Sequence, residues 1–266
     1  MTSLAELLAD LEAEHADLDA LVAGLDEAGW DRATPSPGWA VRDQVSHLAF
    51  FDDAAAMAIT DPDRFRAVAG AALASDADPM EEHLRRGRAL AGAALLVWWR
   101  GSRSDMLRAA RTLAPHDRVP WFGPPMGALS FVSARIMETW AHGQDVADAL
   151  GTTRSPTARL RHVAHLGVRA RPFSYAVRGL EAPSDDVRVE LLAPAGDRWE
   201  WGDPAAAAWV RGGALDFCLV VTQRRHLLDT ALEVHGEPAR QWLSIAQAFA
   251  GPPGPGRPPG GARPGS

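Results

Sequence analysis

Two stretches of sequence decide the fold of this chain: GWAVRDQVSHL at residues 38–48 and ETWAH at residues 138–142. Each lies in a long segment whose apolar residues recur at helical spacing, so both are predicted to be helical. In a helix, Glu138 and His142 lie on one face, one turn apart. If a neighbouring helix carries His47, two histidines and one carboxylate come together. Three protein ligands leave one coordination position open, which is typical of a catalytic rather than a structural metal site.

Spacing alone leaves another interpretation of this pattern open. A Glu–His pair four residues apart is also an ordinary hydrogen bond on a helix face, and Asp43 and His47 have the same spacing. However, the neighbours of His47, Glu138 and His142 are mostly apolar or aromatic, so we expect the three side chains to point inward. A buried carboxylate needs a charge partner, and a divalent cation supplies one. Zinc fits such a set, as does non-haem iron(II).

Long amphipathic segments predict a four-helix bundle over residues 1–152. The four expected helices span residues 3–28, 41–60, 80–113 and 128–150. Asp61-Pro62 ends the second helix, and Gly101-Ser102 is expected to interrupt the third. Gly151 follows the fourth helix in the position of a C-terminal cap.

The pattern changes towards the C-terminus. Residues 153–180 are predicted to form a connecting helix, and residues 181–250 a small α/β domain. A hairpin is expected there, with strands at 187–191 and 198–201 around a turn at 194–197, followed by helices at 205–225 and 236–249. The Gly- and Pro-rich residues 251–266 are predicted to be a disordered tail. The expected fold class is therefore α+β.

Composition excludes several functional classes. The 266 residues carry a formal net charge of −7, which argues against nonspecific nucleic-acid binding and against a basic membrane-binding surface. No apolar stretch reaches the ~18 residues of a membrane span, and the first residues do not resemble a signal peptide. A cytoplasmic location is expected. Cys218 is the single cysteine and lies in an apolar run, so we interpret it as a buried hydrophobic residue rather than a nucleophile.

The motifs resemble those of the DinB-like superfamily. The resemblance rests on Gly38-Trp39-x-Val41-Arg42-Asp43-x3-His47-Leu48, on Glu138-x3-His142-x2-Asp145 and on Ala149-Leu150-Gly151. The chain is most similar to the mycothiol-dependent maleylpyruvate isomerase branch of actinobacteria. This resemblance implies a four-helix bundle in which His47, Glu138 and His142 bind a divalent metal, usually zinc.

The resemblance also concerns the C-terminal part. Gly213-Ala214-x-Asp216-Phe217-x-Leu219 and Thr222-Gln223-Arg224-Arg225 are similar to a metal-binding actinobacterial subfamily. Isomerases of the superfamily carry a small sterol-carrier-like α/β domain here, and an arginine of that domain contributes to the active site. The resemblance therefore implies such a role for Arg224 or Arg225, with mycothiol as the co-substrate.

These observations favour a metal-dependent thiol transferase or isomerase, in which a low-molecular-weight thiol attacks an electrophilic small molecule. An arginine of the C-terminal domain would hold a substrate carboxylate. Two alternatives stay open: a metal-hydroxide hydrolase or lyase that uses no thiol, and a non-enzymatic protein that binds a small molecule. The sequence leaves open the substrate, the choice between monomer and homodimer, and the roles of His162, His165 and Asp145.

Overall fold

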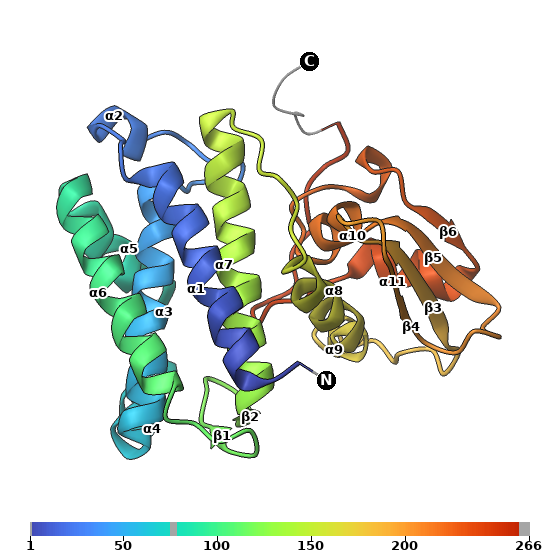
Figure 1. The fold of residues 1–266 in the computed structure, drawn as a ribbon, viewed down its shortest axis with the longest axis horizontal. Helices are drawn as coiled ribbons and strands as arrows, with labels where there is room; N and C mark the ends of the chain where they lie inside the picture. The colour runs from blue at the N-terminus through green and yellow to red at the C-terminus, as the bar shows by residue number, and fades with distance from the viewer. Residues whose placement is uncertain (1, 75–78, 261–266) are drawn as a thin grey trace. The chain divides into compact units, whose positions relative to one another are not determined.

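The computed structural model describes residues 2–74 and 79–260, which belong to two compact units (Figure 1). The first unit extends to Thr153 and the second begins at Arg154. The segment 153–180, predicted to be a connector, thus lies almost entirely in the second unit. The predicted α+β class is confirmed, with a helical N-terminal region and a small sheet in the second unit.

Four long helices form the first unit: α1 (Leu4–Val22), α3 (Val41–Thr60), α6 (Gly92–Ala110) and α7 (Ala128–Leu150). Helix α3 packs against α6 and α7, and α1 packs against α7 and α6. Figure 1 shows the four helices side by side. No helix in the described part of the chain is long and apolar enough to cross a membrane.

Shorter elements connect these helices. They are α2 (Glu27–Trp30), α4 (Pro62–Leu73), α5 (Pro79–Arg88) and the paired strands β1 (Arg118–Val119) and β2 (Met126–Gly127). Helix α4 follows α3 directly. Asp61 ends α3 and caps α4, since its carboxylate accepts a hydrogen bond of 3.1 Å from the Arg64 amide. Pro62 is tolerated because it occupies the first turn of a helix, where its missing N–H is not needed.

The third predicted helix, over residues 80–113, is interrupted at a different place than predicted, because α5 ends at Arg88 and α6 begins at Gly92. The break depends on tertiary contacts. The Glu27 carboxylate accepts a hydrogen bond of 2.8 Å from the Gly92 amide, and a side chain at Gly92 would collide with the buried ring of Trp30. In contrast, Gly101-Ser102 does not interrupt α6, because the Ser102 hydroxyl donates to the Trp98 carbonyl within the helix.

The bundle core contains two apolar clusters separated by a polar layer. One cluster includes Leu11, Met106 and Phe131, and the other is formed around Leu18 and Trp99. Between them, each of the four long helices contributes a buried polar side chain; these are His15, Asp52, Ser102 and Arg135.

Within this layer the Arg135 guanidinium donates two hydrogen bonds to Asp52 Oδ1, at 2.8 and 3.2 Å. Asp52 Oδ2 lies 4.0 Å from His15 Nε2. Neither ring nitrogen of His15 has a hydrogen-bond partner among the described residues. A buried, hydrogen-bonded Arg–Asp pair therefore lies beside an imidazole in the middle of the bundle.

The second unit begins with helices α8 (Leu160–Arg169) and α9 (Arg171–Ala176). Its sheet has the order β4-β3-β5-β6, with β3 parallel to β5 and antiparallel to β4, and β5 antiparallel to β6. The strands are β3 (Val187–Leu192), β4 (Arg198–Trp201), β5 (Ala208–Gly213) and β6 (Glu233–His235). The predicted hairpin is confirmed as β3 and β4.

Helices α10 (Ala214–Val221) and α11 (Glu237–Ile245), with the short 3-10 helix η1 (Leu227–Asp229), complete this unit. The predicted helix over 205–225 is wrong in its first half, where residues 208–213 form β5. Val210 is fully buried in that strand. Gly212, at φ 148°, has a backbone conformation that a helix does not contain, and the helix starts only after Gly213.

Residues 251–260 follow α11 without a helix or strand. Their backbone makes several hydrogen bonds to the second unit. Gly251 O accepts from Gln247, Gly254 O accepts from Arg178, and the Gly260 amide donates to the Asp229 carboxylate. The last part of the predicted tail, residues 261–266, lies outside the described residues.

Candidate metal centre

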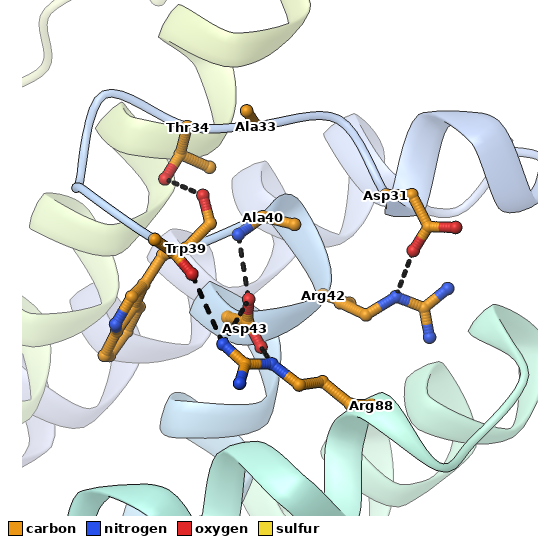
Figure 2. Close-up of a pocket in the computed structure, with 9 residues that line it drawn as sticks. Asp31, Ala33, Thr34, Trp39, Ala40, Arg42, Asp43 and Arg88 are labelled. Carbon is orange, nitrogen blue, oxygen red and sulfur yellow. Dashed lines mark hydrogen bonds and ion pairs between the residues drawn. The ribbon is translucent and has the colours of Figure 1, made fainter.

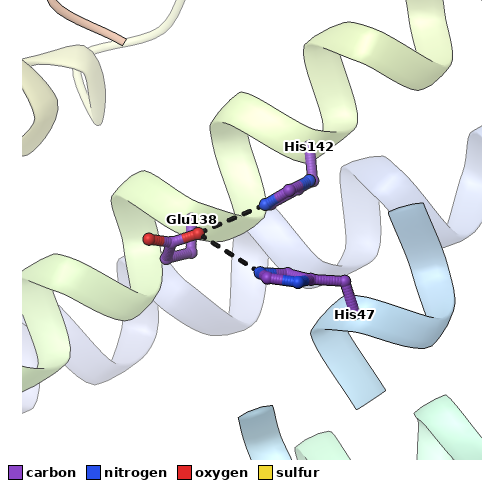
Figure 3. A group of neighbouring side chains, drawn as sticks. All are labelled: His47, Glu138 and His142. Atoms are coloured by element: carbon purple, nitrogen blue, oxygen red, sulfur yellow. Dashed lines mark ion pairs between the residues drawn. The ribbon is translucent and has the colours of Figure 1, made fainter. Parts of the chain in front are cut away.

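The structure brings His47, Glu138 and His142 together on the facing sides of α3 and α7 (Figure 3). Glu138 Oε2 lies 3.2 Å from His142 Nε2 and 3.8 Å from His47 Nε2. The two imidazole rings lie 4.4 Å apart between centroids. The Glu138 side chain is 20% exposed, that of His142 10% and that of His47 11%. The group is therefore largely buried but still partly accessible to solvent.

The spacing of these atoms fits a bound cation. In a tetrahedral zinc site with ligands at about 2.05 Å, two ligand atoms lie about 3.4 Å apart. The two observed separations from Glu138 bracket this value, and one ligand atom from each side chain lies within 4.8 Å of the others. The three side chains can therefore converge on one divalent ion with little rearrangement.

A chain of hydrogen bonds fixes the tautomer of His142. Thr34 Oγ1 donates to the Trp39 carbonyl at 2.8 Å, so its oxygen accepts from Gln44 Nε2 at 2.9 Å. The amide oxygen of Gln44 must then face His142 Nδ1, which lies 2.5 Å away. An amide oxygen only accepts, so Nδ1 carries the hydrogen. Metal-binding histidines are held by their second nitrogen in this way.

This tautomer leaves His142 Nε2 without a hydrogen on the side that faces Glu138. If Nδ1 carries the single hydrogen of a neutral ring, His142 Nε2 presents a lone pair to the Glu138 carboxylate. Two acceptors at 3.2 Å repel each other unless positive charge is added. Either protonation of the imidazole or a cation on both atoms supplies that charge. The donor set thus suits a metal ion on chemical grounds as well as on spacing.

The Glu138 carboxyl is held in its ionised form. Burial acts to raise the pKa of Glu138, but hydrogen bonding and positive charge from His142 and His47 outweigh burial and hold the pKa well below its usual range. An ionised carboxylate is the form that binds metals.

Aromatic rings surround the histidines. The Trp39 ring stacks on His142 at 6.0 Å with an interplanar angle of 16°, and lies 5.4 Å from His47. The centroid of the Phe51 ring lies 4.6 Å from that of His47. Trp99 and Trp140, in contrast, are buried in the bundle. Trp39 therefore packs against both histidines of the site.

The motif residues Arg42 and Asp43 hold the start of α3 in place through hydrogen bonds. Arg42 donates to Asp31 at 2.6 Å, to Glu27 at 3.1 Å and to the Leu90 carbonyl at 2.8 Å. Asp43 accepts from the Ala40 amide at 2.9 Å, as expected for an acid in the first turn of a helix. These bonds fix the beginning of α3 and hence the direction of His47 one turn later.

Gln44 was not predicted from the sequence to hold His142, and the sequence left the role of Asp145 open. Asp145 is buried and accepts a hydrogen bond of 3.1 Å from Ser36. The available signal for Gln44 was its place three residues before His47, which puts both side chains on the same face of a predicted helix.

Arg224 and Arg225 lie in the second unit, in the turn that ends α10. Both amides donate to the Leu219 carbonyl, at 2.7 and 3.2 Å. Gln223 has φ 59°, the one positive φ outside glycine among the described residues, and such a conformation requires support from its surroundings. The Arg224 side chain is buried and donates to the Thr222 carbonyl, whereas Arg225 is half-buried.

His162 and His165 lie on α8, away from the triad in sequence and in the other unit. Trp201 Nε1 donates to His165 Nδ1 at 3.1 Å. Burial, aided by the charge of Arg169, lowers the pKa of His165. His165 is thus an exposed histidine that contacts the edge strand β4 through Trp201.

Fold and site together define a class of protein: a helical bundle that holds two histidines and a carboxylate in metal-binding geometry, joined to a small α/β unit. Residues 11–147 match the model of the mycothiol maleylpyruvate isomerase N-terminal domain family. This match covers just over half of the chain, and the chain belongs to that family.

Relatives and solved structures resemble the chain over most of its length. Uncharacterized proteins from two strains of Mycobacterium tuberculosis are each 47% identical over 250 residues, which cover 94% of this chain and 97% of theirs. A crystal structure of the mycothiol-dependent maleylpyruvate isomerase superposes with a TM-score of 0.55 at 18% identity, covering 84% of this chain and 90% of that chain. A histidine-to-alanine mutant of that enzyme gives the same TM-score at 17% identity. The two-part fold is therefore shared.

Proposed function

We propose that this protein is a metal-dependent enzyme that activates a low-molecular-weight thiol for attack on an electrophilic small molecule. The observation that carries the proposal is the convergence of His47, Glu138 and His142 in ligand geometry, in a chain of the mycothiol maleylpyruvate isomerase N-terminal domain family. Zinc is the proposed metal and mycothiol the proposed thiol.

The residues of the chain have distinct roles in this proposal. His47, Glu138 and His142 hold the metal, and Gln44 keeps His142 Nε2 available as a ligand. A divalent metal supplies a positive charge that lowers the pKa of a coordinated thiol towards neutrality. Trp39 and Phe51 pack against the imidazoles and limit the access of water.

The thiol reaction follows from this arrangement. Sulfur forms a bond to an electrophilic carbon of the substrate. In an isomerase, the electron pair of the substrate double bond moves onto a conjugated carbonyl group as sulfur adds, and rotation about the resulting single bond follows. The electron pair then returns and the same sulfur–carbon bond breaks, so that the thiol is recovered. In a transferase the sulfur–carbon bond is kept, and a leaving group departs from that carbon with its electron pair. We propose that Arg224 or Arg225 holds a substrate carboxylate, for which a guanidinium fork is suited. Cys218 takes no part, because it is fully buried and burial raises the pKa of its thiol strongly.

The first test is the metal content of the purified full chain by elemental mass spectrometry. We expect about one zinc per chain, as in sites with three protein ligands, and loss of that metal in His47→Ala and Glu138→Ala. His116→Ala is the control, because His116 is an exposed histidine outside the site. Turnover of electrophilic substrates is then measured with and without mycothiol.

The outcomes separate this proposal from its rivals. A wild-type protein that stays metal-free after reconstitution with zinc or iron contradicts the metal-dependent function. The alternative that then stands is a non-enzymatic protein that binds a small molecule. Turnover that needs the metal but not the thiol contradicts the thiol chemistry and supports a hydrolase or lyase. Iron as the native metal contradicts the assignment of zinc.

A further inference from the structure

Polar side chains join α3 to α7 at three levels along the interface of these two helices. From the N-terminal end of α3 onwards, the pairs are Gln44–His142, His47–Glu138 and Asp52–Arg135. The partners on α7 run backwards along the chain as those on α3 run forwards, so the two helices are antiparallel. The candidate metal centre (Figure 3) therefore lies between two hydrogen-bonded cross-links.

The cross-link made by Asp52 and Arg135 is buried. The Arg135 guanidinium donates to Asp52 Oδ1 at 2.8 and 3.2 Å, and the two residues are 3% and 0% exposed respectively. Asp52 Oδ2 has no hydrogen-bond partner among the described residues, so the bonds from Arg135 are those that hold this carboxyl group. Two bonds from one planar guanidinium fix the direction of the contact as well as its length.

The spacing of the two hydrogen-bonded cross-links is matched on the two helices. On α3, Gln44 and Asp52 lie eight residues apart, about 12 Å at the helical rise of about 1.5 Å per residue. On α7, Arg135 and His142 lie seven residues apart, which is about 10.5 Å. A slide of α7 along α3 by one residue would move the bonded atoms by about 1.5 Å and break both cross-links.

The bundle core around this pair is otherwise apolar and less selective for register. Met106 and Phe131 belong to one apolar cluster, and Leu18 and Trp99 to the other. Hydrophobic burial is non-directional, so apolar contacts alone accept small shifts of one helix along another. The best-attested use of a buried polar group among packed helices is to fix their register.

Other hydrogen bonds hold the N-terminal end of α3, but they attach it to different elements (Figure 2). Arg42 donates at 2.6 Å to Asp31, the residue that follows α2. Arg88 of α5 donates to Asp43 at 2.8 Å. Because these bonds do not involve α7, the position of α7 along α3 depends on the cross-links between the two helices. The one made by Arg135 lies on the far side of the metal centre from this end.

We infer that Asp52 and Arg135 are positioning residues for the candidate metal centre: their pair sets the register of α7 along α3, and thereby the separation of His47 from Glu138. This inference rests on the proposed function. Without the pair, α7 can settle at other positions along α3, and the ligands then meet the metal in a less regular geometry. Metal affinity falls although the bundle stays folded.

The test replaces the pair with apolar side chains in Asp52→Leu/Arg135→Met. Replacing both members of a buried pair is often neutral for stability, so we expect a folded bundle with a Tm close to that of wild type. Its zinc Kd, measured by competition with a chromophoric chelator, should rise at least about tenfold, as when residues that orient metal ligands are lost. The visible absorption of the cobalt(II)-loaded chain depends on coordination geometry and should differ from that of wild type.

Two single substitutions separate hydrogen bonding from charge. In Asp52→Asn the amide oxygen still accepts from Arg135, so zinc affinity and the cobalt(II) spectrum should stay close to those of wild type. Arg135→Lys keeps the charge but not the two-point bond, and we expect a smaller rise in Kd, about threefold, the effect of one weak hydrogen bond. Arg135→Lys also carries the test if the double substitution unfolds the bundle.

The matched control is Asp19→Leu/Arg103→Met. It removes another Asp–Arg pair, which joins α1 to α6. These two helices carry no ligand of the candidate centre. The control should keep the zinc affinity and the cobalt(II) spectrum of wild type, even where its Tm falls.

Each outcome decides the positioning role. Unchanged zinc affinity in the double variant and in Arg135→Lys overturns it. So does a zinc affinity that follows Tm across all variants, the control included, because the pair would then act through stability alone. Equal losses in Asp52→Asn and in the double variant assign the effect to charge and overturn it as well. A wild-type chain that binds neither zinc nor cobalt(II) contradicts the proposed function itself, whereas wild-type binding with unaffected variants removes the positioning role alone.

Discussion

Replacement of Gln44 tests whether the hydrogen-bond chain through His142 controls metal binding. In Gln44→Leu the side chain keeps a similar volume but presents no acceptor to His142 Nδ1 and no donor to Thr34. The imidazole can then rotate or exchange tautomers, which moves the hydrogen to Nε2, the atom that faces Glu138. Gln44 is fully buried, so water does not readily replace the lost bond.

The size of the effect follows from two sources. Leaving the buried Nδ1–H without a partner costs about 1–3 kcal/mol. Loss of a residue that orients a metal-binding histidine lowers metal affinity about 10–100-fold, equivalent to about 1.4–2.7 kcal/mol. We therefore expect a metal dissociation constant at least tenfold higher in Gln44→Leu. In Gln44→Glu a carboxylate oxygen still accepts from Nδ1–H, so that variant should keep its metal.

The assay is competition between the protein and a chromophoric zinc chelator. Gln144→Leu is the matched control, because Gln144 is also a mostly buried glutamine on a long helix, but bonds to Asp148 at 2.8 Å instead of to the triad. If Gln44→Leu binds zinc as tightly as wild type, or if Gln144→Leu weakens binding equally, the role assigned to Gln44 is refuted.

Three further predictions concern other parts of the chain. Burial, with the charges of Arg103 and Arg135, lowers the pKa of His15 from 6.5 to about 3, so the unfolded state binds more protons than the folded state between these two pH values. Wild type should therefore lose stability relative to His15→Gln by up to ~1.4 kcal/mol per pH unit as the pH falls below 6.5. Urea unfolding from pH 7.5 to 4.5 measures this difference, and a pH-independent difference would argue against a neutral buried imidazole. Gly92→Ala should destabilise the protein by about 1–3 kcal/mol through overpacking, while Gly101→Ala, at an open position of the same helix, should stabilise it by up to ~1 kcal/mol; thermal unfolding of the two variants checks the opposite signs. Cys218→Ala should leave thiol-dependent turnover unchanged, and iodoacetamide should not label the folded protein, so rapid labelling followed by mass spectrometry would contradict the buried position of Cys218.

The sequence predicted the parts of the fold that depend on local pattern. Helix α7 is continuous and amphipathic, and Gly151 ends it with φ 66° as a left-handed cap. The spacing of Glu138 and His142 puts them on one face of that helix, and the GWAVRDQVSHL stretch supplies the partner histidine. Each of these features depends on residues within a few turns of a single helix.

The features that were missed depend on residues far apart in the chain. The break before Gly92 arises from Glu27 and Trp30, more than sixty positions earlier. Strand β5 exists because β3 offers it a parallel partner, although its alanine-rich start favours a helix locally. The pairing of Gln44 with His142 joins two helices, so periodicity within either helix could not reveal it.

The stretch at residues 38–48 therefore serves structure and chemistry at once. Arg42 and Asp43 fix the first turn of α3 through bonds to α2, to α5 and to the preceding loop. Because that turn is fixed, Gln44 meets His142 and His47 faces Glu138. The preceding loop takes part as well, because Thr34 accepts the hydrogen bond of the Gln44 amide group that faces His142. A substitution that loosens this turn should therefore disturb His47 and His142 together and weaken metal binding, as the loss of residues that orient metal-binding histidines does.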